Sequence, residues 1–246
     1  MPFPDLSFFE RKKTLFLAHA GADIDSIASA AAVFFSLKSK KNSAIGAIDH
    51  VNLGAAAFAK NLEIPFAVNP DFGPFDFIVA FDFNDFEMAG TQKEKLKNFS
   101  GKIFAVDHHK KTKNPVALPK NSLIDERAVS ATEVVFSWLK KSKVKLNAKS
   151  ASCIACGAIV DSAWFHVADH GTFEIMAQAM KASGHTFSGL VSLFEVKHDI
   201  SEKIAKLKAA RRVRIFKSFD HLIAFSNVGS FESSAAMALS ILGASV

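Results

Sequence analysis

The stretch Lys-Ile-Phe-Ala-Val-Asp-His-His, residues 102–109, decides how this chain folds and where its chemistry lies. Its first five residues form a mostly apolar run without helical periodicity, which is typical of a buried strand. An acid and two histidines follow at once, although such side chains are costly to place beside apolar structure unless something compensates them. The stretch therefore predicts a strand that delivers polar ligands to one rim of a sheet.

The same arrangement recurs outward along the chain. Thr14–Ala18 precedes His19, and Phe77–Phe81 precedes Asp82, so two further strand-like runs end in polar candidates. Another acid, Asp161, lies in a segment of small and apolar residues. Because the carboxyl ends of parallel strands meet at one rim of an open sheet, we expect the groups that follow the strands to lie together there.

Strands alternate with helices in the first half of the chain, and helices dominate the second half. The predicted strands cover residues 14–18, 43–48, 77–81, 102–106 and 221–225. The predicted helices cover residues 25–39, 53–61, 130–141, 149–162, 172–182, 187–194, 200–216 and 231–242. This order predicts an α/β fold: a mostly parallel sheet with helices on both faces, followed by helices and the start of a small C-terminal α/β domain.

The chain is long enough for one large domain with a smaller partner. We expect a first domain over residues 1–195, a basic helical linker over 196–220 and a partial domain over 221–246. The segment after the basic helix, of about 30 residues, is short for a domain with its own core. It is expected to pair with the first domain, to be completed by a second copy or another chain, or to be a fragment.

The composition is that of an ordinary globular protein, with 49% hydrophobic and 22% charged residues among 246. Because the chain has no tyrosine, a tyrosine acid, base or nucleophile is excluded. The net charge of +6 suits either a solvated surface or attraction of polyanions, and the sequence leaves both open. The longest apolar stretch, near Ala28–Leu37, is too short to span a membrane, and the N-terminus lacks a signal-peptide pattern.

Two cysteines, Cys153 and Cys156, are too few for a disulfide scaffold, and they favour a reducing, cytoplasmic setting. Their spacing would suit a redox or zinc pair, but the sequence has no second pair and small residues surround them. We interpret them as packing residues of a helix.

The candidate ligands are acids and histidines in four clusters. They are His19, Asp23, Asp25, Asp82, Asp107, His108, His109 and Asp161. Taken singly, several have simpler explanations: Asp25 could cap a helix, Asp82 could end a strand, and the two histidines could form a surface pair. Together, their oxygen and nitrogen atoms suit Mn²⁺ or Mg²⁺, and two adjacent divalent ions make a phosphoester-cleaving site.

Four segments in this order resemble the motifs of the DHH phosphoesterase superfamily. They are residues 19–29 (His-Ala-Gly-Ala-Asp-Ile-Asp-Ser-Ile-Ala-Ser), 78–82 (Ile-Val-Ala-Phe-Asp), 106–109 (Val-Asp-His-His) and 157–165 (Gly-Ala-Ile-Val-Asp-Ser-Ala-Trp-Phe). Residues 122–135 resemble a further shared stretch, so the match extends over residues 14–185. Residues 223–246 resemble the opening of the DHHA1 substrate domain of oligoribonucleases and RecJ-like proteins.

The resemblance implies two Mn²⁺ ions, with Mg²⁺ or Co²⁺ as alternatives. His19, Asp23 and Asp82 would hold one ion. The second ion would be held by Asp25, Asp82, His108 and Asp161. The superfamily's glycine-rich substrate loop is absent from this sequence, so we expect a fragment, or a chain that forms a homodimer or takes a partner chain to complete this domain.

The resemblance also implies roles around the ions. Asp107 and His109 would be catalytic: Asp107 would orient a ligand imidazole, and His109 would contact the substrate phosphate. Ser130 and Thr132 would also bind the substrate. Lys110, which directly follows the histidines, could add attraction for phosphate or could be a solvated surface residue.

The function that the resemblance implies is Mn²⁺-dependent phosphodiester hydrolysis of short single-stranded oligonucleotides or small nucleotides by a two-metal mechanism. An inorganic pyrophosphatase of the same superfamily is one alternative, disfavoured because the C-terminal segment is unlike the cationic substrate domain of that branch. A non-catalytic nucleic-acid-binding scaffold on the same fold is another. Loss of metal ligands would mark a scaffold, and all six expected ligands are present.

Overall fold

The structure is a computed structural model that describes residues 3–196 and 200–245. The chain divides into two compact units, Met1–Glu195 and Val196–Val246, which are described separately. Residues 197–199 of the predicted linker and Val246 of the predicted final domain lie outside the described residues. Among the helices of the described residues, none has the length and apolar character needed to cross a bilayer.

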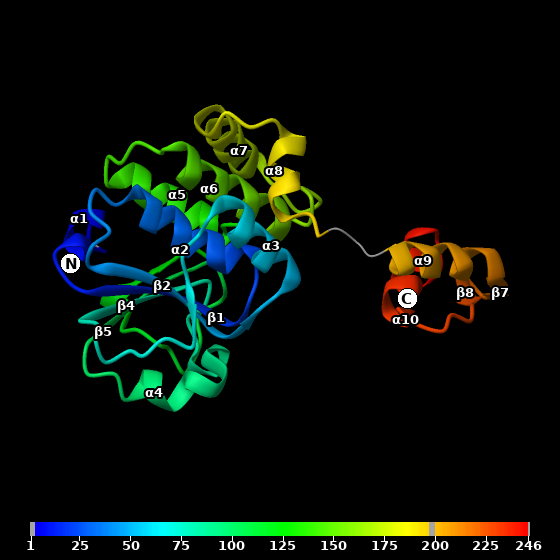
Figure 1. Cartoon of the computed structure of the whole chain (residues 1–246), viewed down its shortest axis with the longest axis horizontal. Coiled ribbons are helices and arrows are strands. Elements are labelled where there is room, and N and C mark those ends of the chain that lie inside the picture. The colour runs from blue at the N-terminus through cyan, green and yellow to red at the C-terminus, as the bar shows by residue number, and fades with distance from the viewer. Residues whose placement is uncertain (1–2, 197–199, 246) are drawn as a thin grey trace. The chain divides into compact units, whose positions relative to one another are not determined.

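A six-stranded parallel sheet forms the centre of the first unit (Figure 1). Its strands are β1 (Thr14–Ala22), β2 (Ser43–Val51), β3 (Ala67–Val68), β4 (Phe77–Phe81), β5 (Lys102–Asp107) and β6 (Ser122–Ile124). Their order is β3-β2-β1-β4-β5-β6, and every neighbouring pair is parallel. The apolar residues of β1, β4 and β5 are largely buried, as expected for strands that are covered on both faces.

Helices cover both faces of this sheet, so the predicted fold class is confirmed. They are α1 (Leu6–Glu10), α2 (Ile24–Ser36), α3 (Leu53–Leu62), η1 (Phe86–Gln92), α4 (Lys93–Lys97), η2 (Pro119–Asn121), α5 (Ala131–Lys141), α6 (Ala148–Asp161), α7 (His170–Ser183) and α8 (Phe187–Phe194). Figure 1 shows α2, α3, α5 and α6 on one face and α4 on the other. One hydrophobic core joins Ile27 of α2 and Ile154 of α6 to the first face, and a second core around Leu17 and Leu96 lies on the opposite face.

The direction in which strands are added to the sheet reverses at β1. This strand pairs with β2 on one side and with β4 on the other. In open parallel sheets the carboxyl ends of the strands leave a crevice at such a reversal. His19, near the end of β1, and Asp82, directly after β4, therefore flank the place where a ligand crevice forms.

The second unit is a small α/β arrangement. Its elements are α9 (Ile200–Arg212), β7 (Arg214–Ser218), β8 (His221–Phe225) and α10 (Glu232–Ile241). The predicted helix over residues 200–216 is wrong at its end, because Ile215 and Phe216 pair antiparallel with β8. β-branched and aromatic side chains favour this extended pairing over the helix that the preceding lysines and alanines form. The core of the unit is small and centres on Ala209, Ala235 and Leu239.

Candidate metal centre

The second half of β1 and the start of α2 bring three predicted ligands, His19, Asp23 and Asp25, to the carboxyl end of the sheet. α2 begins directly after Asp23, whose carboxylate accepts a hydrogen bond from the backbone N–H of Ser26 at 3.0 Å. The Ser26 hydroxyl accepts one in return from the backbone N–H of Asp23 at 3.1 Å. This reciprocal cap fixes the start of the helix. The capping carboxylate is thus that of Asp23 rather than that of Asp25, and Oδ1 of Asp23 also lies 3.7 Å from Nε2 of His19.

Asp82 occupies the centre of the cluster. It follows β4 with a left-handed backbone (φ 62°), which aspartate tolerates better than most residues, and only 2% of it is exposed. Its Oδ2 lies 3.5 Å from Nε2 of His19, and its Oδ1 lies 3.4 Å from Nε2 of His108. The two oxygens of one carboxylate therefore join the residues of β1 to those that follow β5.

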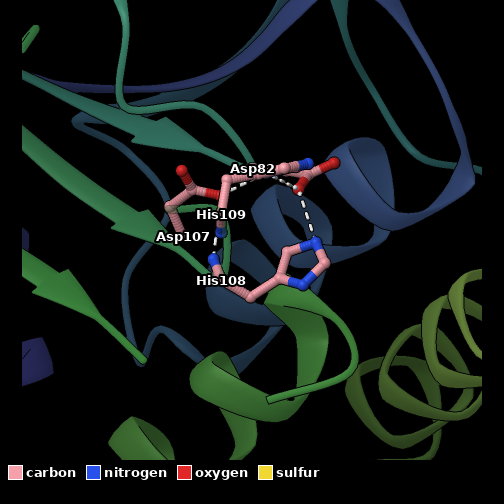
Figure 2. A group of neighbouring side chains, drawn as sticks. All are labelled: Asp82, Asp107, His108 and His109. Carbon is pink, nitrogen blue, oxygen red and sulfur yellow. Dashed lines mark hydrogen bonds and ion pairs between the residues drawn. The ribbon is translucent and has the colours of Figure 1, made fainter. Parts of the chain in front are cut away.

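The segment after β5 directs its acid and its two histidines to different places (Figure 2). Nε2 of His108 lies between Asp82 and Asp161, 3.2 Å from Oδ2 of Asp161. Asp107 is fully buried, and its Oδ1 accepts a hydrogen bond from the backbone N–H of His108 at 2.8 Å and lies 2.9 Å from Nδ1 of His109. The side chain of His109 is 49% exposed. His108 is therefore largely enclosed by the acidic cluster, whereas His109, whose Nδ1 also lies 3.5 Å from Oδ1 of Asp82, is half-exposed.

Asp25, in the first turn of α2, is fully buried against the start of α5. Its carboxylate accepts hydrogen bonds from the backbone N–H groups of Ala131 at 2.6 Å and Thr132 at 3.1 Å. These donors belong to the first turn of α5, where free N–H groups and the helix dipole stabilise a negative charge. Gly157 of α6 permits this arrangement, because a Cβ at that position would lie 2.5 Å from Oδ1 of Asp25.

Three groups of side chains thus share members and form one continuous cluster. The groups are Asp82, Asp107, His108 and His109; His19, Asp23 and Asp82; and Asp25, His108 and Asp161. Within each group, one nitrogen or oxygen atom per residue lies within 4.8 Å of the others. The cluster draws on β1, α2, α6 and the turns after β4 and β5, which are far apart in the sequence.

Contacts with carboxylates raise the pKa of the two inner histidines. Burial by itself lowers the pKa of His19, but contacts with Asp23 and Asp82 outweigh burial and raise it to about 10. Burial likewise lowers the pKa of His108, and contacts with Asp161 and Asp82 raise it to about 11. The cluster therefore has an excess of negative charge that positive charge must compensate.

The pKa values of two acids in the cluster, Asp25 and Asp161, also reflect this excess of negative charge. Burial raises the pKa of Asp25 well above its usual value, and the carboxylates of Asp82 and Asp161 add to that rise. Burial also raises the pKa of Asp161. Divalent cations at this position would compensate the carboxylates without protons.

The donor atoms of the cluster fit divalent cations. Two buried atoms, Oδ1 of Asp82 and Nε2 of His108, have no hydrogen-bond partner, although they lie 3.4 Å apart. Buried polar atoms normally form hydrogen bonds, so an oxygen and a nitrogen that make only ion-pair contacts indicate a group that belongs between the side chains. Carboxylate oxygens and imidazole nitrogens together are ligands of divalent metals such as Mn²⁺.

All six residues predicted as metal ligands belong to this cluster. They are His19, Asp23, Asp25, Asp82, His108 and Asp161. Their binding of an ion stays a prediction. His109 is half-exposed within the cluster, and the next residue, Lys110, is exposed, so both are accessible to a substrate.

The structure places Asp107 where it orients an imidazole, the role predicted for it, and away from any direct contact with a substrate. Its carboxylate is fully buried and holds hydrogen bonds on both oxygens, so it does not reach a substrate. The imidazole that it orients is that of His109, rather than that of a predicted metal ligand.

Ser130 and Thr132 also differ from the substrate contacts predicted for them, because neither has exposed surface. The Ser130 hydroxyl caps α5 by accepting a hydrogen bond from the backbone N–H of Glu133 at 3.2 Å. Thr132 lies 2.9 Å from that hydroxyl and donates its own backbone N–H to Asp25. Both residues therefore shape the start of α5, which in turn holds Asp25.

Sequence reasoning missed two residues of the site. Asn84 donates a hydrogen bond from Nδ2 to Oδ2 of Asp107 at 2.6 Å, and no spacing in the sequence signals this contact. Gly157 lies within one of the quoted motifs, but its role depends on Asp25, which is distant in the sequence. The small-residue character of α6 is the one sequence signal of a close approach there.

The fold and the cluster together define an α/β protein whose parallel sheet presents a centre able to hold divalent cations at its carboxyl edge. The profile of the DHH family, N-terminal domain, matches residues 13–158, more than half of the chain. The chain therefore belongs to the DHH family, whose members are phosphoesterases, and the resemblance found in the sequence is confirmed.

One relative and two solved structures are similar to this chain over most of its length. Uncharacterized protein MJ0988 of Methanocaldococcus jannaschii is 27% identical over 248 residues, covering 98% of this chain and 72% of that protein. An exopolyphosphatase-related protein from Bacteroides fragilis superposes with a TM-score of 0.76 at 15% identity, over 95% of this chain and 74% of that one. A Methanococcus jannaschii protein, provisionally described as a family II inorganic pyrophosphatase, superposes with a TM-score of 0.59 at 16% identity, over 93% of this chain and 78% of that one. The two structures show that the fold is shared.

Proposed function

We propose that this protein is a Mn²⁺-dependent phosphodiesterase that hydrolyses short oligonucleotides or small nucleotides by a two-metal mechanism. The observation that carries the proposal is the position of Asp82, whose two carboxylate oxygens face His19 on one side and His108 on the other. A carboxylate between two sets of ligands is the arrangement that a pair of adjacent cations requires.

Two sets of ligands follow from this geometry. His19, Asp23 and Asp82 would hold one ion. The other ion would be held by Asp25, Asp82, His108 and Asp161. When bound, such a pair lowers the pKa of a shared water and neutralises the charge that builds on the phosphoryl oxygens.

The remaining residues of the site orient and bind. Asp107 fixes the imidazole of His109, which is half-exposed beside the cluster and would donate a hydrogen bond to a phosphoryl oxygen. The exposed Lys110 would add attraction for the anionic substrate. The first turn of α5 holds Asp25 without using a charged side chain. We further propose a cytoplasmic setting, which the two free, buried cysteines support.

A second candidate is hydrolysis of a phosphoanhydride, as in pyrophosphate or polyphosphate. It is favoured by the names of the two proteins whose folds superpose with TM-scores of 0.76 and 0.59. The same pair of ions would serve either bond, because both reactions displace an oxygen from phosphorus in line. The two candidate functions therefore share the same metal centre and differ only in the substrate that is hydrolysed.

The test measures hydrolysis by the intact chain with Mn²⁺. We expect turnover of a bis-aryl phosphodiester and of a dinucleotide, and slower turnover of pyrophosphate. Faster release of phosphate from pyrophosphate or polyphosphate would transfer the assignment to the second candidate. If protein that is shown to hold two ions hydrolyses none of these substrates, an enzymatic role is refuted and a binding scaffold is favoured.

The matched variants are Asp82→Asn and Asp49→Asn. Asparagine keeps the shape of aspartate and tolerates a left-handed backbone, so Asp82→Asn removes charge with little strain at φ 62°. Asp49 also has a left-handed backbone (φ 59°), but its carboxylate binds Thr91 and lies outside the cluster. We expect Asp82→Asn to lower hydrolysis at least about 100-fold, since even partners one step removed from a metal contribute 10–100-fold. Asp49→Asn should retain hydrolysis within a few-fold.

A further inference from the structure

Asn84 lies two residues after Asp82 and is only 4% exposed. Its side-chain amide donates to Oδ2 of Asp107 at 2.6 Å and to the backbone carbonyl of Lys110 at 3.2 Å. A buried amide with both N–H groups directed at such acceptors is held in one orientation. Asn84 therefore connects the segment that carries Asp82 to the segment that carries the two histidines.

The carboxylate of Asp107 transmits this contact. Its Oδ2 accepts the hydrogen bond from Asn84, while its Oδ1 lies 2.9 Å from Nδ1 of His109. Because Asp107 is fully buried, no solvent is available to replace a lost partner. The rotation of the Asp107 carboxylate, and with it the direction of the His109 imidazole, is thus set from one side by Asn84.

Backbone contacts reinforce the same connection. The N–H of Val116 donates to the carbonyl of Asn84 at 2.9 Å, and the N–H of Phe86 donates to the carbonyl of Asn114 at 3.1 Å. Both of these bonds lie at the far end of the loop after β5, while the bond from the Asn84 side chain to Lys110 holds its near end. Among these contacts, the side chain of Asn84 reaches the residues nearest to the cluster.

We propose that Asn84 is a positioning residue that fixes the His109 imidazole, through Asp107, at the substrate side of the centre. This inference rests on the proposed function, in which His109 contacts the substrate phosphate. Within the described part of the chain, the side-chain hydrogen bonds of Asn84 go to Asp107 and to the backbone carbonyls of His109 and Lys110, and none goes to a predicted metal ligand. Its loss should leave the ions in place and misdirect the imidazole.

The test compares Asn84→Ala, His109→Ala and the double variant in the intact chain loaded with Mn²⁺. We expect Asn84→Ala to lower kcat/KM about 10–100-fold, because a displacement of about 1 Å at a reacting group costs that much. The double variant should be no worse than His109→Ala alone, because Asn84 acts through His109. Asn121→Ala is the matched control: its amide donates to a backbone carbonyl, that of Ile103 at 3.3 Å, and it should leave kcat/KM unchanged.

A measurement that does not depend on hydrolysis distinguishes the positioning role of Asn84 from the proposed enzymatic function. In protein loaded with diamagnetic Mg²⁺, the side-chain ¹⁵N signals of His109, assigned by their loss in His109→Ala, should shift in Asn84→Ala and stay unchanged in Asn121→Ala. The Mn²⁺ stoichiometry should remain two in both variants. If the wild type hydrolyses nothing, the proposed function fails, while the shifted His109 signals still support the positioning role. Unchanged His109 signals, or rate losses that add fully in the double variant, would refute that role.

Discussion

Gly157→Ala separates helix propensity from the requirements of the metal centre. Gly157 lies within α6, where glycine is normally less stable than alanine by about 0.5–1 kcal/mol. Propensity alone therefore predicts that alanine stabilises the protein. In the structure, however, a Cβ at this position would lie 2.5 Å from Oδ1 of Asp25 and would also overlap the side chain of Thr132.

The size of the displacement decides the outcome. To reach ordinary contact at 3.4 Å from 2.5 Å, the carboxylate of Asp25 must retreat by about 0.9 Å. Metal sites tolerate errors of about 0.2 Å in ligand distance, so Asp25 could no longer serve as a ligand at its present position. Overpacking of a core costs about 1–3 kcal/mol, which exceeds the gain in helix propensity. We expect a net loss of about 1–2 kcal/mol and at least a tenfold weaker affinity for the second Mn²⁺.

The measurement is titration of Mn²⁺ by calorimetry, together with thermal unfolding of the metal-free protein. Gly189→Ala in α8 is the matched control, because the atoms nearest to its added Cβ, the Thr186 hydroxyl at 3.3 Å and Nδ1 of His185 at 3.4 Å, lie outside the metal cluster. The control should bind two ions with unchanged affinity and be as stable as the wild type or slightly more so. A Gly157→Ala variant that binds both ions as the wild type does, with raised stability, would refute the reasoning.

Two further predictions concern titration. In EDTA, His19 and His108 have pKa values raised from 6.5 to about 10 and about 11, so they stabilise the fold fully below pH 6.5. This stabilisation should be lost progressively as the pH rises toward 10 and 11, and urea denaturation of the metal-free protein measures the loss. A free energy of unfolding that increases over this pH range would contradict the prediction. Burial raises the pKa of Cys153 and Cys156, so a thiol reagent at pH 9 should label both slowly in the folded protein and rapidly after denaturation. Fast labelling of folded protein would show that the thiols are accessible.

Much of the fold follows from local sequence patterns. The apolar runs that became β4 and β8 have the predicted bounds, as does α8, because each is a short continuous segment with clear flanking signals. β1 is longer than expected, so His19 lies within the strand rather than after it. The helix predicted through residue 216 ends at Arg212, because pairing with β8 overrides helix propensity there.

The amino-acid sequence by itself determined which chemistry is available: acids and histidines follow the strands of a parallel sheet, and strand direction sends their side chains to one rim. Only the tertiary structure decided how these residues divide their work. It buried Asp107, Ser130 and Thr132 away from any substrate, left His109 exposed, and gave Asn84 and Gly157 roles that no local pattern predicts. The physical reason is that burial and hydrogen-bond partners depend on contacts between segments such as α2, α5 and α6, which lie up to about 130 residues apart in the chain and meet only when the core packs.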